Sequence, residues 1–155
     1  MTVTIKKGNM AHLEVCKDVL LNSVVGEVYF PKERLAEKFL KEGLTKREIY
    51  VALNEDGDCV GYMWIVLNGM FYRFPYLKNI AVKEKHRGKG IGRRMLDFYV
   101  DAAFKHAKKI FITTSGFNTR AQKLYKKTGF KHVGTIPNLY KRGVSEYLMM
   151  KSKGR

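Results

Sequence analysis

The sequence predicts an α+β domain, in which a mixed, mostly antiparallel sheet of about seven strands carries four helices on its faces. Seven short β-rich segments and four amphipathic segments follow one another in the order β-α-α-β-β-β-α-β-α-β-β. Two of the strands flank an Asp-Gly turn, which is typical of an antiparallel hairpin. The length of 155 residues fits one compact core, so we expect residues 1–155 to form a single domain.

The first third of the chain predicts one strand and two helices. Residues 2–6 alternate between polar and apolar side chains, as in a short strand. Asn9 is a good N-cap for a helix with one apolar face, formed by Leu13, Cys16, Val19 and Leu20. We expect a break at residues 25–27, and then a second helix with Pro31 in its first turn and Gly43 at its end.

The middle of the chain predicts three strands and a long helix. Residues 48–53 and 59–67 form the hairpin around the Asp-Gly turn, and residues 76–82 form the next strand. A glycine-rich turn then leads into a helix over about residues 90–107. Its apolar face is expected to contain Ile91, Met95, Phe98, Tyr99 and Ala102.

The last third predicts three strands and one helix. Residues 109–114 form a buried strand, and residues 119–128 form a short helix that Gly129 ends. Residues 130–136 and 144–151 are the two closing strands.

Composition limits the possible partners and environments. The chain has 30 Lys and Arg against 14 Asp and Glu, a net charge of +16, which favours anionic partners such as nucleic acid, an acidic protein or a polyphosphate cofactor. A solvated lysine-rich surface would have the same composition. The apolar runs are too short to span a bilayer, and the N-terminus lacks an apolar signal core, so we expect a cytoplasmic protein without a membrane partner. Cys16 and Cys59 lack metal-ligand spacing, so we expect two buried, reduced thiols and no metal site.

The glycine-rich turn has the composition of a phosphate-binding site. Residues 86–94 read His-Arg-Gly-Lys-Gly-Ile-Gly-Arg-Arg, after a predicted strand and at the start of a predicted helix. The first amides of a helix have no intrahelical partner and carry a partial positive charge, and glycines let an anion approach the backbone closely. The Walker pattern is excluded because its Gly-Lys-Ser/Thr element is absent. The dinucleotide pattern Gly-x-Gly-x-x-Gly is excluded because Arg93 or Met95, depending on the register, stands where the third glycine would be.

At two linked blocks the sequence resembles the GNAT superfamily of N-acetyltransferases. Residues 87–92, Arg-Gly-Lys-Gly-Ile-Gly, match that family's signature Arg/Gln-x-x-Gly-x-Gly/Ala after the fourth strand. A second family pattern, Asn-x-x-Ala-x-x-x-Tyr followed by Gly-Phe, is matched by Asn118, Ala121, Tyr125, Gly129 and Phe130. The resemblance implies a single acetyltransferase domain over residues 1–155, with strands four and five splayed apart to admit acetyl-coenzyme A.

The resemblance also implies which residues bind this cosubstrate. The pantetheine arm is expected along the fourth strand, at Ile80, Ala81 and Val82. The pyrophosphate is expected on Arg87, Gly88, Lys89, Gly90, Ile91, Gly92 and Arg93. Asn118, Ala121 and Tyr125 complete the expected set, and the backbone N–H of Val82 is the expected oxyanion donor. No metal is implied.

The reaction implied by the resemblance is direct attack of a primary amine on the thioester, within a ternary complex. The amine must lose a proton, because a lysine-type amine has a pKa of about 10.4. The Tyr125 hydroxyl is the expected donor to the departing sulfur. Relatives that acetylate ribosomal-protein N-termini share Asn-Ile-Ala-Val at residues 79–82 and, more vaguely, Asn-Leu-Tyr at residues 138–140, but carry a glutamate where this chain has Thr113. The candidate bases are therefore Glu27, Glu146 or a chain of water molecules.

The acceptor is open at this stage. It is a small-molecule or peptide amine, and the exposed aromatic residues around 71–76 would permit either a monomer or a homodimer. Two alternatives remain: a non-catalytic acyl-coenzyme A sensor on the same fold, and a basic nucleic-acid-binding module. No recognisable nucleic-acid motif supports the second alternative.

Overall fold

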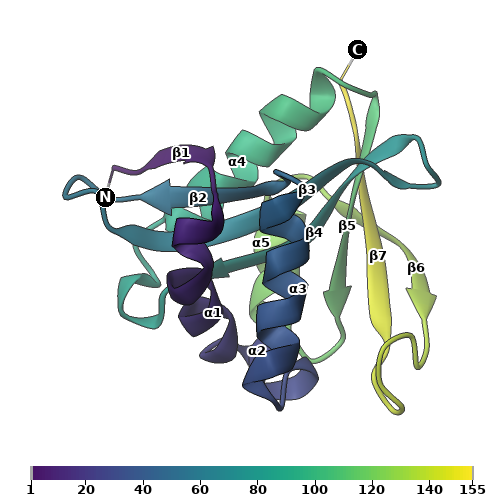
Figure 1. The fold of residues 1–155 in the computed structure, drawn as a ribbon. Helices are drawn as coiled ribbons and strands as arrows, with labels where there is room; N and C mark the ends of the chain where they lie inside the picture. Colours follow the sequence, from purple (N-terminus) through teal and green to yellow (C-terminus); the bar gives the residue numbers. More distant parts are fainter. Residues whose placement is uncertain (1, 155) are drawn as a thin grey trace. The chain divides into compact units, whose positions relative to one another are not determined.

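The computed structural model describes residues 2–154 (Figure 1). The chain divides into two compact units: unit 1 is Met1–Ile65 with Asn79–Phe98, and unit 2 is Val66–Lys78 with Tyr99–Arg155. The helices and strands are β1 (Thr4–Lys7), α1 (Leu13–Leu21), α2 (Val24–Tyr29), α3 (Glu33–Thr45), β2 (Ile49–Leu53), β3 (Cys59–Met70), β4 (Phe74–Val82), α4 (Ile91–Phe104), β5 (Lys109–Ser115), α5 (Thr119–Lys127), β6 (Lys131–Ile136) and β7 (Glu146–Ser152). Short 3-10 turns, η1 (Met10–His12) and η2 (Glu84–His86), precede α1 and α4.

The predicted fold class is confirmed. Seven strands form one mixed sheet in the order β1-β2-β3-β4-β5-β7-β6. The pairs β1–β2, β2–β3, β5–β7 and β6–β7 are antiparallel, and β4–β5 is parallel. The β4–β5 register comprises Tyr76–Phe111 and Leu77–Ile112.

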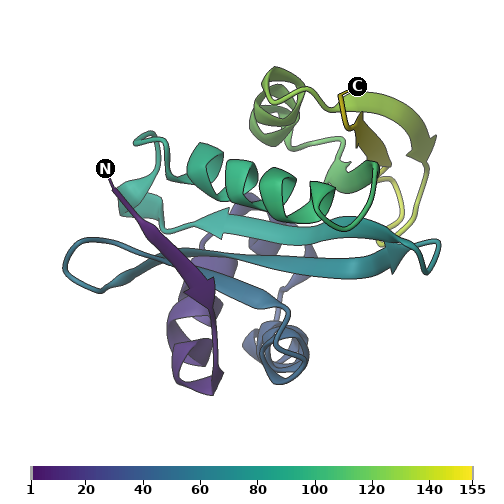
Figure 2. The ribbon, with the colours of Figure 1, turned by 90° about the horizontal axis from the view of Figure 1, so that it is seen from above.

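Unit 1 packs helices on both faces of β2 and β3. Figure 2 shows α1 and α3 on one face and the first turns of α4 on the other. The core between them contains large, fully buried side chains, including Tyr62 and Trp64 of β3 and Met95 of α4. The buried Lys17 amine joins α1 to α3, because its Nζ lies 2.8 Å from a Glu33 carboxylate oxygen and 3.1 Å from one of Glu14.

The N-terminal helices differ in detail from the prediction. Five α-helices form within residues 2–154 where four were expected, because the expected break at 25–27 is the helix α2. The Ser23 hydroxyl caps α2 by accepting from the Gly26 amide at 3.0 Å. Gly26 is buried, and a Cβ built on it would lie 1.8 Å from the Leu20 carbonyl oxygen. Glycine at this position therefore permits close packing against the end of α1, rather than breaking the helix.

Three other expected helix ends also differ. Asn9 caps η1 rather than α1, since its side chain accepts from the Ala11 amide at 2.9 Å. Pro31 precedes α3, which begins at Glu33. Gly43 lies inside α3, where a Cβ would lie 2.6 Å from Ile49 Cδ1 and 2.9 Å from the Trp64 ring, so it is a packing glycine rather than a helix end.

Unit 2 contains the strands β5, β7 and β6, which are neighbours in the sheet in this order. In the chain, α5 follows β5 and precedes β6. Tyr99 donates to the Phe111 carbonyl at 2.8 Å, which joins α4 to β5. Gly129 ends α5 as expected, with φ of +98°, and the following Phe130 amide donates to the Tyr125 carbonyl at 3.0 Å. β6 is the outermost strand, and five of its six residues are exposed.

The two cysteines are free thiols, and the predicted burial is confirmed for Cys16 but not for Cys59. Cys16 is buried in α1, and Cys59 is half-buried at the start of β3. A hydrogen bond between the two side chains raises the pKa of Cys16 and lowers the pKa of Cys59.

Candidate active site

The turn between β4 and α4 in unit 1 has the backbone of an anion-binding loop. Gly88 and Gly90 have φ of +76° and +83°, a region that side chains with a Cβ disfavour. A Cβ built on either residue would meet no atom within 4 Å. The glycines are therefore needed for the course of the backbone, and the space outside the turn stays open.

The turn leads directly into the N-terminus of α4. The Arg94 amide donates to the Gly90 carbonyl at 3.0 Å, so the amides of residues 91–93 precede the first bond of the helical ladder. Such amides carry a partial positive charge. Lys89, Arg93 and Arg94 are exposed around them. This arrangement fits a diphosphate, the group that the sequence predicts here.

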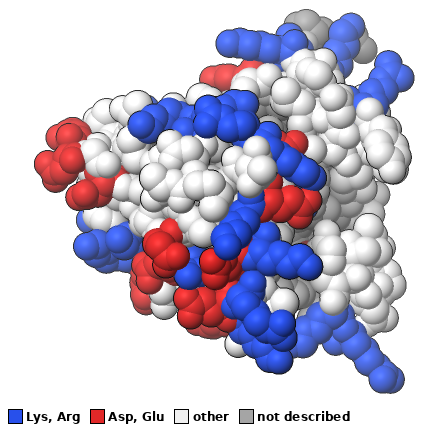
Figure 3. All heavy atoms as spheres, in the orientation of Figure 1, with Lys and Arg blue, Asp and Glu red and all other residues white. Residues whose placement is uncertain are grey.

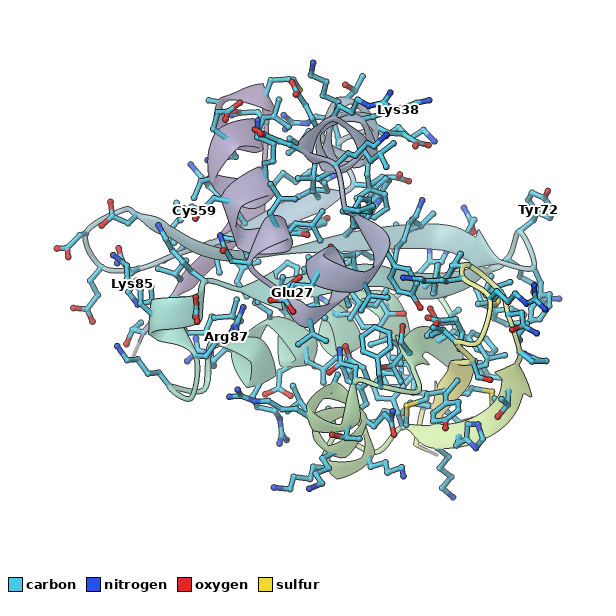
Figure 4. All side chains as sticks on the ribbon, turned by 90° about the horizontal axis from the view of Figure 1, so that it is seen from below. Glu27, Lys38, Cys59, Tyr72, Lys85 and Arg87 are labelled. Atoms are coloured by element: carbon cyan, nitrogen blue, oxygen red, sulfur yellow. The ribbon has the colours of Figure 1, made fainter. Side chains whose placement is uncertain are left out.

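Arg87 holds the turn in place. Its Nε donates to the Val82 carbonyl at 3.1 Å, and its Nη2 donates to the Asn22 carbonyl at 3.0 Å. Figure 4 shows Arg87 on this turn, together with Lys85 on the preceding η2. The guanidinium thus ties the end of β4 to the residue after α1, and it serves as a positioning group for the loop. Arg93 Nε also has a protein partner, the Asp97 carboxylate at 3.1 Å.

The end of β4 is fixed from within unit 1. Ala81 is buried, whereas Ile80 and Val82 are half-buried. The Tyr62 hydroxyl donates to the Asn79 side-chain oxygen, which anchors the residue before this segment. A Cβ on Gly61 would lie 2.9 Å from the Ala81 carbonyl oxygen, so β3 and β4 approach closely at this point.

His86 at the base of the turn is a feature that the sequence analysis did not single out. Its Nδ1 is buried and has no hydrogen-bond partner within residues 2–154. Burial, followed by the charges of Lys89, Lys85 and Lys83, lowers the pKa of His86. The ring is therefore neutral at pH 7.

Glu27 lies on α2 rather than in a loop. Its amide donates to the Ser23 carbonyl at 3.0 Å, and its side chain is exposed. Figure 4 shows Glu27 on α2. The position leaves its carboxylate accessible to solvent, as a base would require.

In unit 2, the residues of the second predicted block are all on or next to α5. The Asn118 side chain caps α5 by accepting from the Ala121 amide at 3.3 Å. Tyr125 is buried, with its ring packed edge-on against Phe130 at 6.4 Å between centroids. Burial raises the pKa of the Tyr125 hydroxyl, so this phenol is protonated at neutral pH and can act as a donor.

A carboxylate–hydroxyl cluster lies on one face of the unit 2 sheet. The Ser115 hydroxyl donates to Glu146 Oε1 at 2.9 Å, and the Tyr76 and Thr113 hydroxyls lie 2.7 Å apart. Thr113 and Ser115 point to the same face because side chains alternate along a strand. Glu146 shares this face because it is directly opposite Ser115 in the β5–β7 register.

The cluster places a carboxylate on the same face as Thr113, the position at which the resemblance to ribosomal-protein acetyltransferases implies a glutamate. Glu146 is only 4% exposed. Burial, and to a smaller extent the electrostatic interaction with Tyr140, raises the pKa of the Tyr76 hydroxyl. The role of Ser115 could not be predicted from sequence, because its bond to Glu146 depends on pairing between residues 31 positions apart.

Within the described residues, no group of three or more His, Cys, Asp or Glu could hold a metal ion. Among the helices formed by residues 2–154, none is long and apolar enough to span a membrane.

The fold and the two blocks together are those of an acetyltransferase. The sequence pattern of the Acetyltransferase (GNAT) family matches residues 19–130, and the chain belongs to this family of enzymes.

Individual proteins are similar to this chain. N-alpha-acetyltransferase RimI of Mycobacterium tuberculosis is 29% identical over 154 residues, which cover 98% of this chain and 94% of that protein. The chain spans only 27 to 38% of the length of three further curated relatives. Among solved structures, Ard1 of Thermoplasma volcanium has a TM-score of 0.81 at 18% identity, with full coverage of both chains. The yncA protein of Salmonella typhimurium, solved with its cofactor acetyl-CoA, has a TM-score of 0.77 at 16% identity, covering 100% of this chain and 96% of that one. At such identities these structures show the fold.

Proposed function

We propose that this chain transfers the acetyl group of acetyl-coenzyme A to the α-amine of a peptide, by direct attack in a ternary complex. The observation that carries the proposal is the glycine turn at the N-terminus of α4, whose open backbone amides fit a diphosphate. The likeness to N-alpha-acetyltransferase RimI over nearly its whole length supports a peptide acceptor. We further propose that residues 1–155 act as one acetyltransferase domain.

The cosubstrate-binding residues in this proposal come from two segments. Residues 87–93 bind the pyrophosphate, chiefly through backbone amides, because the Arg87 guanidinium is engaged with Val82 and Asn22. Ile80, Ala81 and Val82 bind the pantetheine arm, and the Val82 amide donates to the developing oxyanion. Asn118, Ala121 and Tyr125 complete the binding set.

The chemistry requires one proton to leave the amine and one donor for the sulfur. The neutral amine forms a bond to the thioester carbonyl carbon, the carbon–sulfur bond breaks, and the coenzyme A thiolate leaves. The buried Tyr125 hydroxyl donates to this thiolate, and its raised pKa keeps the proton available. Glu27, which is exposed on α2, accepts the proton of the amine directly or through water.

Glu146 is a second candidate for the base. It is a carboxylate on the same face as Thr113, the position at which ribosomal-protein acetyltransferases carry glutamate. Its 4% exposure means that a proton would reach it through its neighbouring hydroxyls rather than directly from the amine. Comparing Glu27→Gln with Glu146→Gln separates the two, because only loss of the base shifts the acid limb of the pH–rate profile.

The test combines binding and turnover. Calorimetric titration measures acetyl-coenzyme A affinity, and thiol release is then followed against a panel of peptides and small amines. We expect Tyr125→Phe to lower kcat by about 10²-fold or more, as for loss of a proton donor, and to lower affinity for acetyl-coenzyme A much less, because the ring is retained. Tyr50→Phe on β2 of unit 1 is the matched control and should retain full turnover. Equal turnover in both variants would remove Tyr125 from the mechanism.

A further inference from the structure

The net charge of the chain is concentrated in one unit. Unit 2 contains 15 Lys and Arg against only Asp101 and Glu146, a net charge of +13. Unit 1 contains the same number of Lys and Arg but 12 Asp and Glu, a net charge of +3. The overall +16 therefore does not describe a uniformly basic surface.

Unit 1 pairs its charges internally. Lys17, Lys41, Lys46 and Arg93 each lie within 4.0 Å of a carboxylate of the same unit. Figure 3 shows Asp and Glu side chains gathered over α1 and α3. Unit 2 has only two Asp and Glu side chains, and that of Glu146 is buried against Ser115. Lys and Arg side chains of this unit therefore far outnumber its acidic side chains.

The cations of unit 2 are densest on α5. The exposed residues of this helix are Thr119 and four cations: Arg120, Lys123, Lys126 and Lys127. Residues spaced three, four or seven apart share one helix face, and residues 120–127 rise by about 10 Å. A nucleic-acid strand carries one phosphate per about 3.4 Å of axis, so about four phosphates, one for each cation, fit along this face.

The composition of this face favours nucleic acid over other anions. Membrane-binding helices insert apolar side chains, and the exposed residues of α5 include none. The centres of protein–protein interfaces are depleted in lysine, whereas three of the four α5 cations are lysines. Polyphosphate backbones are bound by such exposed, flexible cations through counterion release.

Two loops of the same unit indicate a single strand rather than a duplex. The β3–β4 loop exposes Phe71 and Tyr72 next to Arg73, and Tyr72 is 97% exposed. The β6–β7 loop exposes the ring of Tyr140 next to Lys141 and Arg142. Exposed aromatic rings beside cations stack on unpaired bases, which a duplex does not offer.

We propose that unit 2 binds single-stranded nucleic acid in a sequence-independent manner, with the exposed cations of α5 on the phosphates. This surface is additional to the acetyl-transfer site and does not depend on it.

The test uses the full chain and a fluorescein-labelled oligouridine strand, titrated by anisotropy at increasing salt. Four cations on a single strand give a slope of log K against log salt of about −2.8, or about 50-fold weaker binding from ~50 to ~200 mM salt. The variant Lys123→Gln/Lys126→Gln/Lys127→Gln should lower the magnitude of the slope by about 2, leaving less than ~3-fold salt dependence. Arg120 is left unchanged because it lies between proposed coenzyme A-binding residues.

The matched control removes the same charge from unit 1, as Lys6→Gln/Lys32→Gln/Lys38→Gln. It should bind the strand as the wild type does, and both triple variants should retain the wild-type melting temperature and acetyl-coenzyme A affinity. Equal weakening in both triple variants would mean binding by net charge alone and would overturn the α5 surface. Tighter binding of polyglutamate, of anionic vesicles or of duplex DNA than of oligouridine at the same salt would overturn the proposed partner.

Discussion

The most informative single substitution is Gly90→Glu in the turn before α4. Gly90 has φ of +83°, and a Cβ at this position would meet no atom within 4 Å. The substitution therefore costs the folded protein only the backbone strain of a left-handed residue, about 1–2 kcal/mol. Its carboxylate, however, would point into the open space where we propose that the pyrophosphate binds.

The expected loss of affinity follows from Coulomb's law. Two unit charges 4 Å apart repel each other by about 1 kcal/mol in a water-like dielectric. Two phosphate charges give about 2 kcal/mol, which weakens acetyl-coenzyme A binding by about 30-fold. A lower local dielectric would enlarge the loss, so about 30-fold is the smaller expected value.

Gly57→Glu is a closely matched control. Gly57 in the β2–β3 turn has φ of +86°, belongs to the same unit and likewise has no atom within 4 Å of an added Cβ. Both variants should lose the same stability in urea unfolding, and only Gly90→Glu should lose affinity in calorimetric titration. Equal affinities in the two variants would refute the assignment of the turn.

Three further predictions concern stability and titration. The ion pair with Lys41 lowers the pKa of Glu37, so its contribution to stability is present above the ordinary glutamate pKa of about 4.3 and is lost as the pH falls below it. The difference in urea midpoint between wild type and Glu37→Gln should therefore close below about pH 4; a gap that persists at pH 2 would contradict this. NMR titration should find the pKa of His86 below its ordinary value of about 6.5. Binding of coenzyme A should raise this pKa, because the negative charge of a nearby phosphate favours the protonated ring. An unchanged pKa on binding would argue against a phosphate at the turn. Gly43→Ala should destabilise the protein by about 1–3 kcal/mol despite its better helix propensity, because its Cβ would overlap Ile49; a stabilised variant would show that the core can relax there.

The sequence was most informative where periodicity and turn chemistry agree. Alternation and the Asp-Gly turn predicted the β2–β3 hairpin, and Gly129 correctly marked the end of α5 because its backbone needs a positive φ. Gly26 and Gly43 were misinterpreted as a break and as a helix end. Both are glycines because another element packs against them, and such a contact cannot be seen in the local sequence.

In the candidate site, too, local features were predictable from the sequence and long-range contacts were not. The turn over residues 87–92 is a local pattern and was predicted by residue, because strand, glycines and helix follow one another in the chain. The second role of Arg87 as a positioning group was not predictable, since its partner Asn22 is 65 positions away. The Ser115–Glu146 contact likewise depends on the β5–β7 register, which only the folded sheet defines.

The concentration of charge in unit 2 illustrates a third case. The count of +16 was available from composition, but its division into +13 and +3 requires the boundaries of the folded units. Composition alone left a solvated surface and a polyanion-binding surface equally open. The exposed face of α5 favours the second reading, because four of its five exposed residues are cations.

The most direct measurement of the central claim is the position of the acetyl group on a peptide product. The chain is incubated with acetyl-coenzyme A and a peptide that has both a free α-amine and an internal lysine, and tandem mass spectrometry locates the modification. We expect acetylation at the α-amine, and no product when that amine is blocked. Acetylation of the lysine alone, or turnover only with small amines, would contradict the proposed acceptor.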